Sequence, residues 1–196
     1  MRALHASVAA LLLAGILLSS PGRSADLPTP LNRSDKPAPG EKKLAWLAFD
    51  VATEKAKKEN KHLIVDVYTT WCGWCKVMDR QTYGNPEVAD YLIQNFVLAK
   101  VNGESAAELH WNGKTMSERA FARAVGVTGF PTTYFLKPNA EMIGGAPGFI
   151  RPNDFMVYAK YVNTKWYEKG TPKEYLESMK SDAQPQSPPQ TQHTTN

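Results

Sequence analysis

Apolar and polar residues recur with several different periods along the middle of the chain, which predicts a mixture of helices and strands. Residues 41–60 are expected to form a helix whose solvated side is covered by lysines. Its apolar face would contain Leu44, Leu47, Val51 and Ala52. Residues 63–68 then form a short, β-branched apolar run, typical of a strand covered on both faces. Asp66 interrupts this run and does not fit it by composition.

Capping residues mark where the other helices begin. Asn85 is followed by Pro86, Ser117 can cap the helix that follows it, and residues 171–174 form a capping box with proline at the first helical position. These caps predict helices at residues 86–95, 117–125 and 172–179, and further helices are expected at residues 72–82 and 152–162.

The strands complete an α/β arrangement. Residues 96–101 are expected to form a second strand, and residues 132–136 a hairpin with residues 141–143. Residues 103–116 are an insertion for which a plain surface loop is expected, with part of a partner surface as the alternative. The order of elements predicts an α/β layer sandwich with a mixed central sheet.

The first 25 residues predict an export signal. Arg2 supplies a positive start, residues 6–18 form a short apolar run, and residues 19–22 are small or turn-forming. An uncleaved membrane anchor is the alternative, although the run is short for a bilayer span. No cysteine comes directly after the run, which excludes lipid anchoring there. The mature chain is therefore expected in an oxidising compartment, most simply a bacterial periplasm, without a transmembrane span.

Two segments flank the predicted domain. Residues 26–40 belong to a stretch rich in proline and glycine, which predicts a flexible linker. Residues 181–196 contain three prolines, four glutamines and no large apolar side chain. This composition predicts a disordered tail, because burial cannot offset the loss of chain entropy. One domain is therefore expected over residues 41–180, which is long enough for a core that needs no disulfide scaffold.

The composition and the net charge limit the classes of function that fit this chain. The chain has 196 residues, of which 42% are hydrophobic and 21% charged, as in an ordinary globular protein. Its formal net charge of +4 falls to +2 without residues 1–25, which carry two arginines and no acid. So small an excess of positive charge argues against a dedicated nucleic-acid binder. The two cysteines are too few and too close together to act as a scaffold.

The candidate chemistry lies in the sequence Trp71-Cys72-Gly73-Trp74-Cys75-Lys76. Two thiols separated by two residues, where a strand leads into a helix, can close and reopen a small disulfide ring. Cys72 would sit at the helix N-terminus, where unpaired amides and the helix dipole favour the thiolate that attacks disulfides. Cys75, one turn later and less exposed, would attack the resulting mixed disulfide and release the reduced partner.

Four segments resemble the thioredoxin-fold family and follow the family's order between Leu63 and Ile143. They are Ile64-Val65-Asp66-Val67, Trp71 to Lys76, Ala99 to Asn102, and Gly126 to Thr132. The chain departs from thioredoxins proper at Trp74, where they have proline, and at Phe130, where a smaller aliphatic residue is common. The resemblance implies a thioredoxin fold, with a mixed sheet flanked by helices and an extra C-terminal helix.

The resemblance also implies supporting roles around the cysteines. Asp66 would be a buried carboxyl with a raised pKa that takes the proton from Cys75 through a water, whereas an exposed acid on an edge strand is the alternative. Lys100 would lie close to Asp66, or else be a solvated lysine at the end of a strand. Gly73, between the cysteines, would support the motif.

Substrate contacts are implied beside the disulfide. Pro131 would be cis, and the backbone of Phe130 would pair with an extended substrate strand. An ordinary trans proline in a loop is the alternative. Trp71 and Trp74 would offer an apolar contact to a substrate, although Trp71 could equally pack on its own domain.

Three functions fit these residues. The chain is similar to exported thioredoxin-like proteins of bacteria, including those associated with sulfur oxidation and the C-terminal domain of the transmembrane electron carrier. This similarity implies a periplasmic oxidoreductase that reduces protein disulfides, fed by a membrane dithiol donor, with the Cys72–Cys75 pair in place of a cofactor. An oxidase or isomerase of the same fold is the second function. The third is a metal-binding module in which Cys72 and Cys75 bind zinc or copper together with His62 or His110. Zinc sites with four ligands usually show a second close pair of ligands, and this sequence has none.

Overall fold

The computed structural model describes residues 43–182. The predicted export signal at residues 1–25, the predicted linker at residues 26–40 and residues 183–196 of the predicted tail lie outside the described residues. Among the described residues, no helix has both the length and the apolar composition needed to cross a membrane.

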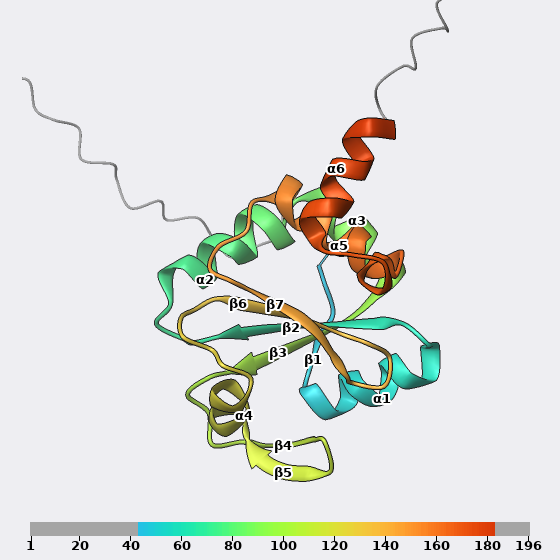
Figure 1. Ribbon diagram of the computed structural model, residues 1–196. Coiled ribbons are helices and arrows are strands. Elements are labelled where there is room, and N and C mark those ends of the chain that lie inside the picture. Colours follow the sequence, from blue (N-terminus) through green and yellow to red (C-terminus); the bar gives the residue numbers. More distant parts are fainter. Residues whose placement is uncertain (1–42, 183–196) are drawn as a thin grey trace, which may run out of the picture. The chain divides into compact units, whose positions relative to one another are not determined.

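Five strands form the mixed sheet at the centre of the domain, in the order β1-β3-β2-β6-β7 (Figure 1). Their bounds are β1 Trp46–Leu47, β2 His62–Tyr68, β3 Phe96–Asn102, β6 Thr132–Leu136 and β7 Met142–Pro147. β3 runs parallel to β1 and β2, whereas β6 is antiparallel to β2 and β7. The central strand β2 has a strand partner on both edges, and its side chains are buried in cores on both faces, as its continuous apolar run predicts.

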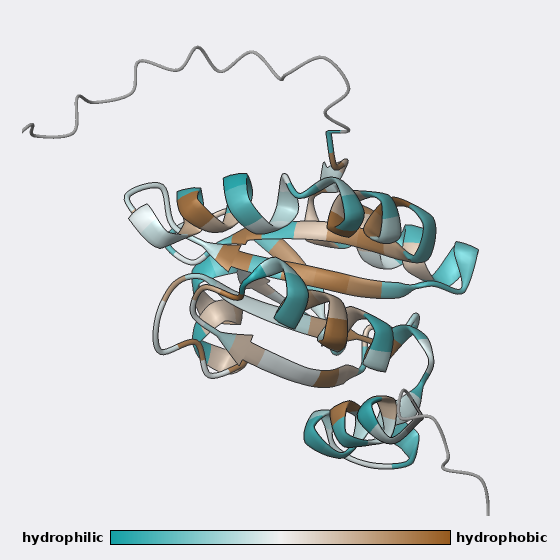
Figure 2. Cartoon of the chain, turned by 90° about the horizontal axis from the view of Figure 1, so that it is seen from above, coloured by the Kyte–Doolittle hydropathy of each residue, from teal (hydrophilic) through white to brown (hydrophobic). Residues whose placement is uncertain are grey.

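Helices cover both faces of this sheet (Figure 2). They are α1 Phe49–Glu59, α2 Gly73–Met78, the π-helical turn η1 Asp79–Tyr83, α3 Pro86–Asn95, α4 Glu118–Ala124, α5 Pro152–Asn163, the 3-10 turn η2 Trp166–Glu168 and α6 Pro172–Asp182. Neighbouring residues of β2 face opposite cores, since Leu63 packs with α1 and α4 whereas Ile64 packs with α3 and α5. Asp66 is two residues from Ile64 and so faces the α3 and α5 side.

The first helix begins later than its hydrophobic pattern predicts. α1 starts at Phe49, and Leu47 instead belongs to β1, where it pairs with Ala99 of β3. The buried face of α1 contains Phe49, Ala52 and Ala56, whereas Val51 is 53% exposed. The prediction of a helix from residue 41 is wrong because the backbone at residues 46–47 gains a strand partner that the pattern of side chains does not reveal.

The insertion at residues 103–116 is a hairpin rather than a plain loop. β4 Glu108–Trp111 and β5 Lys114–Ser117 pair in an antiparallel two-stranded sheet. Asn112 and Gly113 join them with positive φ angles, the backbone that an Asn-Gly hairpin turn requires. Leu109 is buried, and the ring of Trp111 lies 5.3 Å from that of Phe121. These apolar contacts hold the hairpin against α4.

The predicted helix caps are present. The Oδ1 atom of Asn85 accepts from the backbone N–H groups of Glu87 and Val88, and the Oγ atom of Ser117 accepts from that of Ala120. The helix expected at residues 72–82 is α2 continued by η1. α6 extends to residue 182, past the expected end at 179.

Candidate redox site

Cys72 and Cys75 form a disulfide at the point where β2 leads into α2. Their Cα atoms are 5.3 Å apart, and Cys72 is the N-cap residue of α2. Its Sγ atom accepts a hydrogen bond from the backbone N–H of Cys75 at 3.0 Å. Both cysteines are 4% exposed, so the expectation that Cys75 is less exposed is wrong for this disulfide form. The bond between the two Sγ atoms holds them at the same depth.

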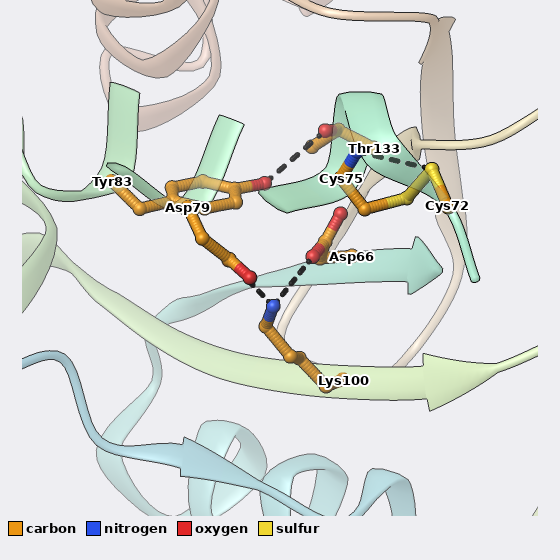
Figure 3. Close-up of polar contacts among 7 residues, drawn as sticks. All are labelled: Asp66, Cys72, Cys75, Asp79, Tyr83, Lys100 and Thr133. Carbon is orange, nitrogen blue, oxygen red and sulfur yellow. Dashed lines mark hydrogen bonds and ion pairs between the residues drawn. A yellow bond between two sulfur atoms is a disulfide. The ribbon is translucent and has the colours of Figure 1, made fainter. Parts of the chain in front are cut away.

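Asp66 and Lys100 are neighbours in the sheet next to this disulfide. They are register partners on β2 and β3, and Lys100 Nζ lies 3.2 Å from Asp66 Oδ2. Asp66 is 2% exposed, so it is a buried acid on a central strand rather than an exposed acid on an edge. Figure 3 shows its carboxyl group between Lys100 and Cys75.

Burial controls the protonation of Asp66. Loss of hydration raises the pKa of its carboxyl from 3.8 to about 6, although the nearby charge of Lys100 acts in the opposite direction. Its Oδ1 atom has no hydrogen-bond partner within residues 43–182. A carboxyl with this pKa can both accept and release a proton near neutral pH.

Asp79 is a member of this site that the sequence reasoning missed. It is the first residue of η1, and its Oδ1 atom lies 2.6 Å from Lys100 Nζ (Figure 3). Asp79 is four residues after Cys75, so helical spacing could have indicated that both face the same side. Its side chain is 43% exposed, in contrast to Asp66. Lys100 therefore connects a buried carboxylate with one at the surface.

Two aromatic rings and two carboxylates surround the ammonium group of Lys100. The Nζ atom lies 5.1 Å from the ring centre of Trp46 and 5.0 Å from that of Tyr68. Burial alone would lower the pKa of Lys100, but Asp66 and Asp79 raise it above the ordinary value on balance. Lys100 thus stays charged and is not a free lysine at a strand end.

Tyr83 is a further buried side chain of this site. The hydroxyl groups of Tyr83 and Thr133 lie 3.3 Å apart (Figure 3). Burial and the nearby Asp66 raise the pKa of Tyr83 well above 10. The phenol therefore keeps its proton at neutral pH.

The loop before β6 has the predicted cis bond between Phe130 and Pro131. Pro131 is buried, and its carbonyl accepts from the backbone N–H of Gly148 at 2.7 Å. The ring of Phe130 lies over Gly103, where an added Cβ atom would come within 2.6 Å of the ring. Because glycine allows this approach, the start of the insertion supports the loop before β6.

Two exposed tryptophans border the disulfide, each with an aromatic partner. Trp71 is 65% exposed, and its ring meets that of Phe130 edge-on with centres 6.0 Å apart. Trp74 is 61% exposed, and its ring lies 5.8 Å from that of Phe149. Trp71 therefore contacts its own domain while most of its surface stays accessible. Gly73 is open, since nothing lies within 4 Å of a Cβ atom placed there.

Glu104 and Phe149 are two further residues that the sequence reasoning missed. The indole N–H of Trp71 donates to Glu104 Oε1 at 2.7 Å, which fixes the orientation of that ring. Glu104 lies in the insertion and Phe149 follows the β6–β7 hairpin. No local pattern in the sequence connects either residue to the cysteines.

The two histidines considered as metal ligands have other partners. His62 Nε2 lies 3.0 Å from the hydroxyl oxygen of Tyr167, and His110 Nδ1 lies 2.8 Å from Asp50 Oδ2. In the part of the chain that the structure describes, no group of three or more His, Cys, Asp or Glu residues is arranged to hold a metal ion.

The family model for the thioredoxin-like domain matches residues 49–163, which is more than half of the chain. The chain belongs to the thioredoxin-like family. The fold expected from the sequence is therefore confirmed as a thioredoxin fold, a mixed five-stranded sheet flanked by helices with a C-terminal helix.

Two curated relatives of this thioredoxin-like chain are distant and much longer than it is. Human spermatogenesis-associated protein 20 is 29% identical over 108 residues, which cover 53% of this chain and 12% of the relative. The thiol:disulfide interchange protein DsbD of Pseudoalteromonas atlantica is 26% identical over 116 residues, which cover 58% of this chain and 18% of DsbD. The chain thus spans less than a fifth of the length of these relatives.

Solved structures support the fold alone. A thioredoxin-fold protein from Helicobacter pylori has a TM-score of 0.53 at 17% identity, covering 63% of this chain and 82% of that one. DsbH oxidoreductase has a TM-score of 0.51 at 18% identity, covering 68% and 93% respectively.

Proposed function

We propose that this protein is a thiol–disulfide oxidoreductase that reduces disulfides of other proteins. The observation that carries the proposal is the buried carboxyl of Asp66, which lies between Lys100 and the Cys72–Cys75 disulfide. A disulfide with a purely structural role has no need of a buried acid beside it, because burial of that acid costs stability.

The first step uses Cys72. In the reduced protein, the thiolate of Cys72 attacks one sulfur of a substrate disulfide, forms a mixed disulfide and releases the other substrate sulfur as a thiolate. The N-cap position favours this thiolate, since Cys72 lies at the positive end of the α2 dipole. The hydrogen bond from the N–H of Cys75 supports the same charge.

The second step uses Cys75 and Asp66. Asp66 accepts the proton of the Cys75 thiol, and the resulting thiolate attacks the Sγ atom of Cys72. The bond between Cys72 and the substrate breaks, the substrate leaves as a second thiolate, and Cys72–Cys75 becomes the disulfide observed here. Two electrons pass from the protein dithiol to the substrate. The proton then passes from Asp66 to solvent, and the charged ammonium group of Lys100 favours this loss because it stabilises the Asp66 carboxylate.

We further propose that the protein works in the periplasm after loss of residues 1–25 and that a membrane dithiol carrier reduces its disulfide again. The signal-like composition of these residues supports the location. The similarity to the thiol:disulfide interchange protein DsbD supports exchange with a dithiol of another protein. Fusing residues 1–25 to alkaline phosphatase tests export, because the phosphatase is expected to become active only if it is carried into an oxidising compartment.

A substrate polypeptide would contact exposed aromatic side chains beside the disulfide. Trp71 and Trp74 flank the disulfide, and their exposed faces offer apolar contact to a polypeptide. The backbone of Phe130, next to the cis bond, is proposed to pair with the extended substrate strand.

The direction of electron transfer is tested by equilibrating the Cys72–Cys75 pair with glutathione and by measuring the reduction of insulin with dithiothreitol. We expect catalysed insulin reduction and a potential nearer the thioredoxin value of about −270 mV than that of strong periplasmic oxidants, about −120 mV. A pair that stays reduced in excess oxidised glutathione would instead assign the protein to the oxidases or isomerases.

A further inference from the structure

A groove of about 530 Å³ lies between β7, α5 and the start of α6. Most of its lining is apolar, including Pro147, Phe149, Val157, Tyr158 and Leu176. A second hollow of about 180 Å³ lies beside it and shares Ala146, Tyr158 and Pro172 with its lining.

The α6 wall of the groove lies beyond residues 49–163, which match the thioredoxin-like domain. Its own residues cap it at the start, and aromatic contacts pack it against α5 and η2. The backbone N–H and the hydroxyl of Thr171 both donate to Glu174 Oε2, at 2.7 and 2.8 Å. The ring of Tyr175 is buried against those of Tyr161 and Trp166. The next residue, Leu176, therefore has a defined place at the groove while remaining 36% exposed.

The groove is continuous with the redox site. Phe149 lines the groove and its ring also contacts that of Trp74, the residue before Cys75. The loop that contains Phe149 is fixed to η1, since the hydroxyl of Thr82 donates to the carbonyl oxygen of Ile150. A polypeptide that brings its disulfide to Cys72 past Trp74 thus meets Phe149 and then the groove.

We propose that this groove binds the polypeptide segment next to the disulfide of a protein substrate and accepts a bulky apolar side chain of that segment. The inference rests on the proposed function for the identity of the occupant. It predicts a preference for disulfides that are flanked by apolar polypeptide over small disulfides, which have no such segment to place in the groove.

The test compares Leu176→Glu with the matched control Met179→Glu in the full chain. Leu176 and Met179 are on the same helix and are 36% and 37% exposed, but only Leu176 lines the groove. We expect Leu176→Glu to raise KM for insulin reduction about tenfold, since burial of one apolar side chain contributes that order of affinity. Its turnover of oxidised glutathione should match that of the wild type, and Met179→Glu should change neither. A smaller loss in the same direction is expected for Leu176→Ala, which keeps α6 uncharged.

A binding measurement separates this inference from the proposed function. The probe is the insulin B chain with its thiols carbamidomethylated, titrated by calorimetry into the oxidised protein. We expect Leu176→Glu to weaken its binding about tenfold and Met179→Glu to leave it unchanged. If the wild type binds the probe but reduces no disulfide, the proposed function fails and the groove stands. Equal binding by both variants, or none by the wild type, overturns the groove inference.

Other occupants would also overturn the inference. Sedimentation that finds a wild-type dimer dissociated by Leu176→Glu would assign the groove to a second copy of the chain. A chain ending at residue 182 that binds the probe at least tenfold more tightly than the full chain would assign it to residues 183–196.

Discussion

Replacement of Asp66 by Asn is expected to stabilise the oxidised protein at neutral pH. The carboxyl is 2% exposed and its pKa is raised from 3.8 to about 6, chiefly by burial. The folded state therefore holds this proton more tightly than the unfolded state does. Stability is greatest when Asp66 is protonated in both states, decreases as the pH rises from about 4, and levels off above about 6.

The size of this effect follows from the two pKa values. Their difference, at about 1.4 kcal/mol for each pH unit, corresponds to roughly 3 kcal/mol of folding stability lost between pH 4 and pH 7. Asn has nearly the same shape as Asp and no charge to desolvate. Asp66→Asn should therefore be more stable than the wild type above pH 6, by up to roughly 3 kcal/mol, and nearly equal to it below pH 4.

Urea unfolding of both oxidised proteins at pH 4, 5, 6, 7 and 8 measures this difference. Asp79→Asn is the control, since Asp79 shares the same lysine but is 43% exposed, so it should gain little stability. If Asp66→Asn is less stable than the wild type at pH 7, or if the difference does not change with pH, the account of a desolvated carboxyl is refuted.

Three further predictions concern residues around the site. Asp79→Asn removes a charge that raises the pKa of Asp66, so the Asp66-dependent midpoint in the pH profile of stability should move to lower pH; an unchanged midpoint would contradict this coupling. Glu104→Ala removes the acceptor for the Trp71 indole, so NMR relaxation of the Trp71 indole N–H group should show a more mobile ring, whereas Glu104→Gln should retain the wild-type value. Gly103→Ala should displace the Phe130 ring, and protein disulfides should then be reduced more slowly while small disulfides are unaffected; equal losses on both would disprove a role for that ring in substrate contact.

Much of the fold follows from local sequence because the deciding interactions are local. Asn85 and Ser117 satisfy the first amides of their own helices, so their positions predict where α3 and α4 begin. The strand β2 is predictable since its residues are buried on both sides. β1 is not, because Trp46 and Leu47 are extended only through pairing with β3, about fifty residues away in the chain.

The residues of the redox site also differ in how far the sequence alone predicts them. Cys72 and Cys75 are three residues apart, and their helical turn alone brings the sulfur atoms together. Asp79 follows the helical repeat from Cys75 and was within reach of the same reasoning. Glu104 and Phe149 reach the tryptophans through tertiary packing, which spacing along one sequence does not encode.

The different roles of Cys72 and Cys75 are tested most directly by trapping the mixed disulfide. Reduced Cys75→Ser should accumulate one covalently bound substrate chain at Cys72 when mixed with insulin, because no thiol is left to displace it, and intact-protein mass spectrometry would detect the adduct. Cys72→Ser should accumulate far less, and the wild type none. An adduct that forms equally at either cysteine, or none in Cys75→Ser, would contradict the mechanism.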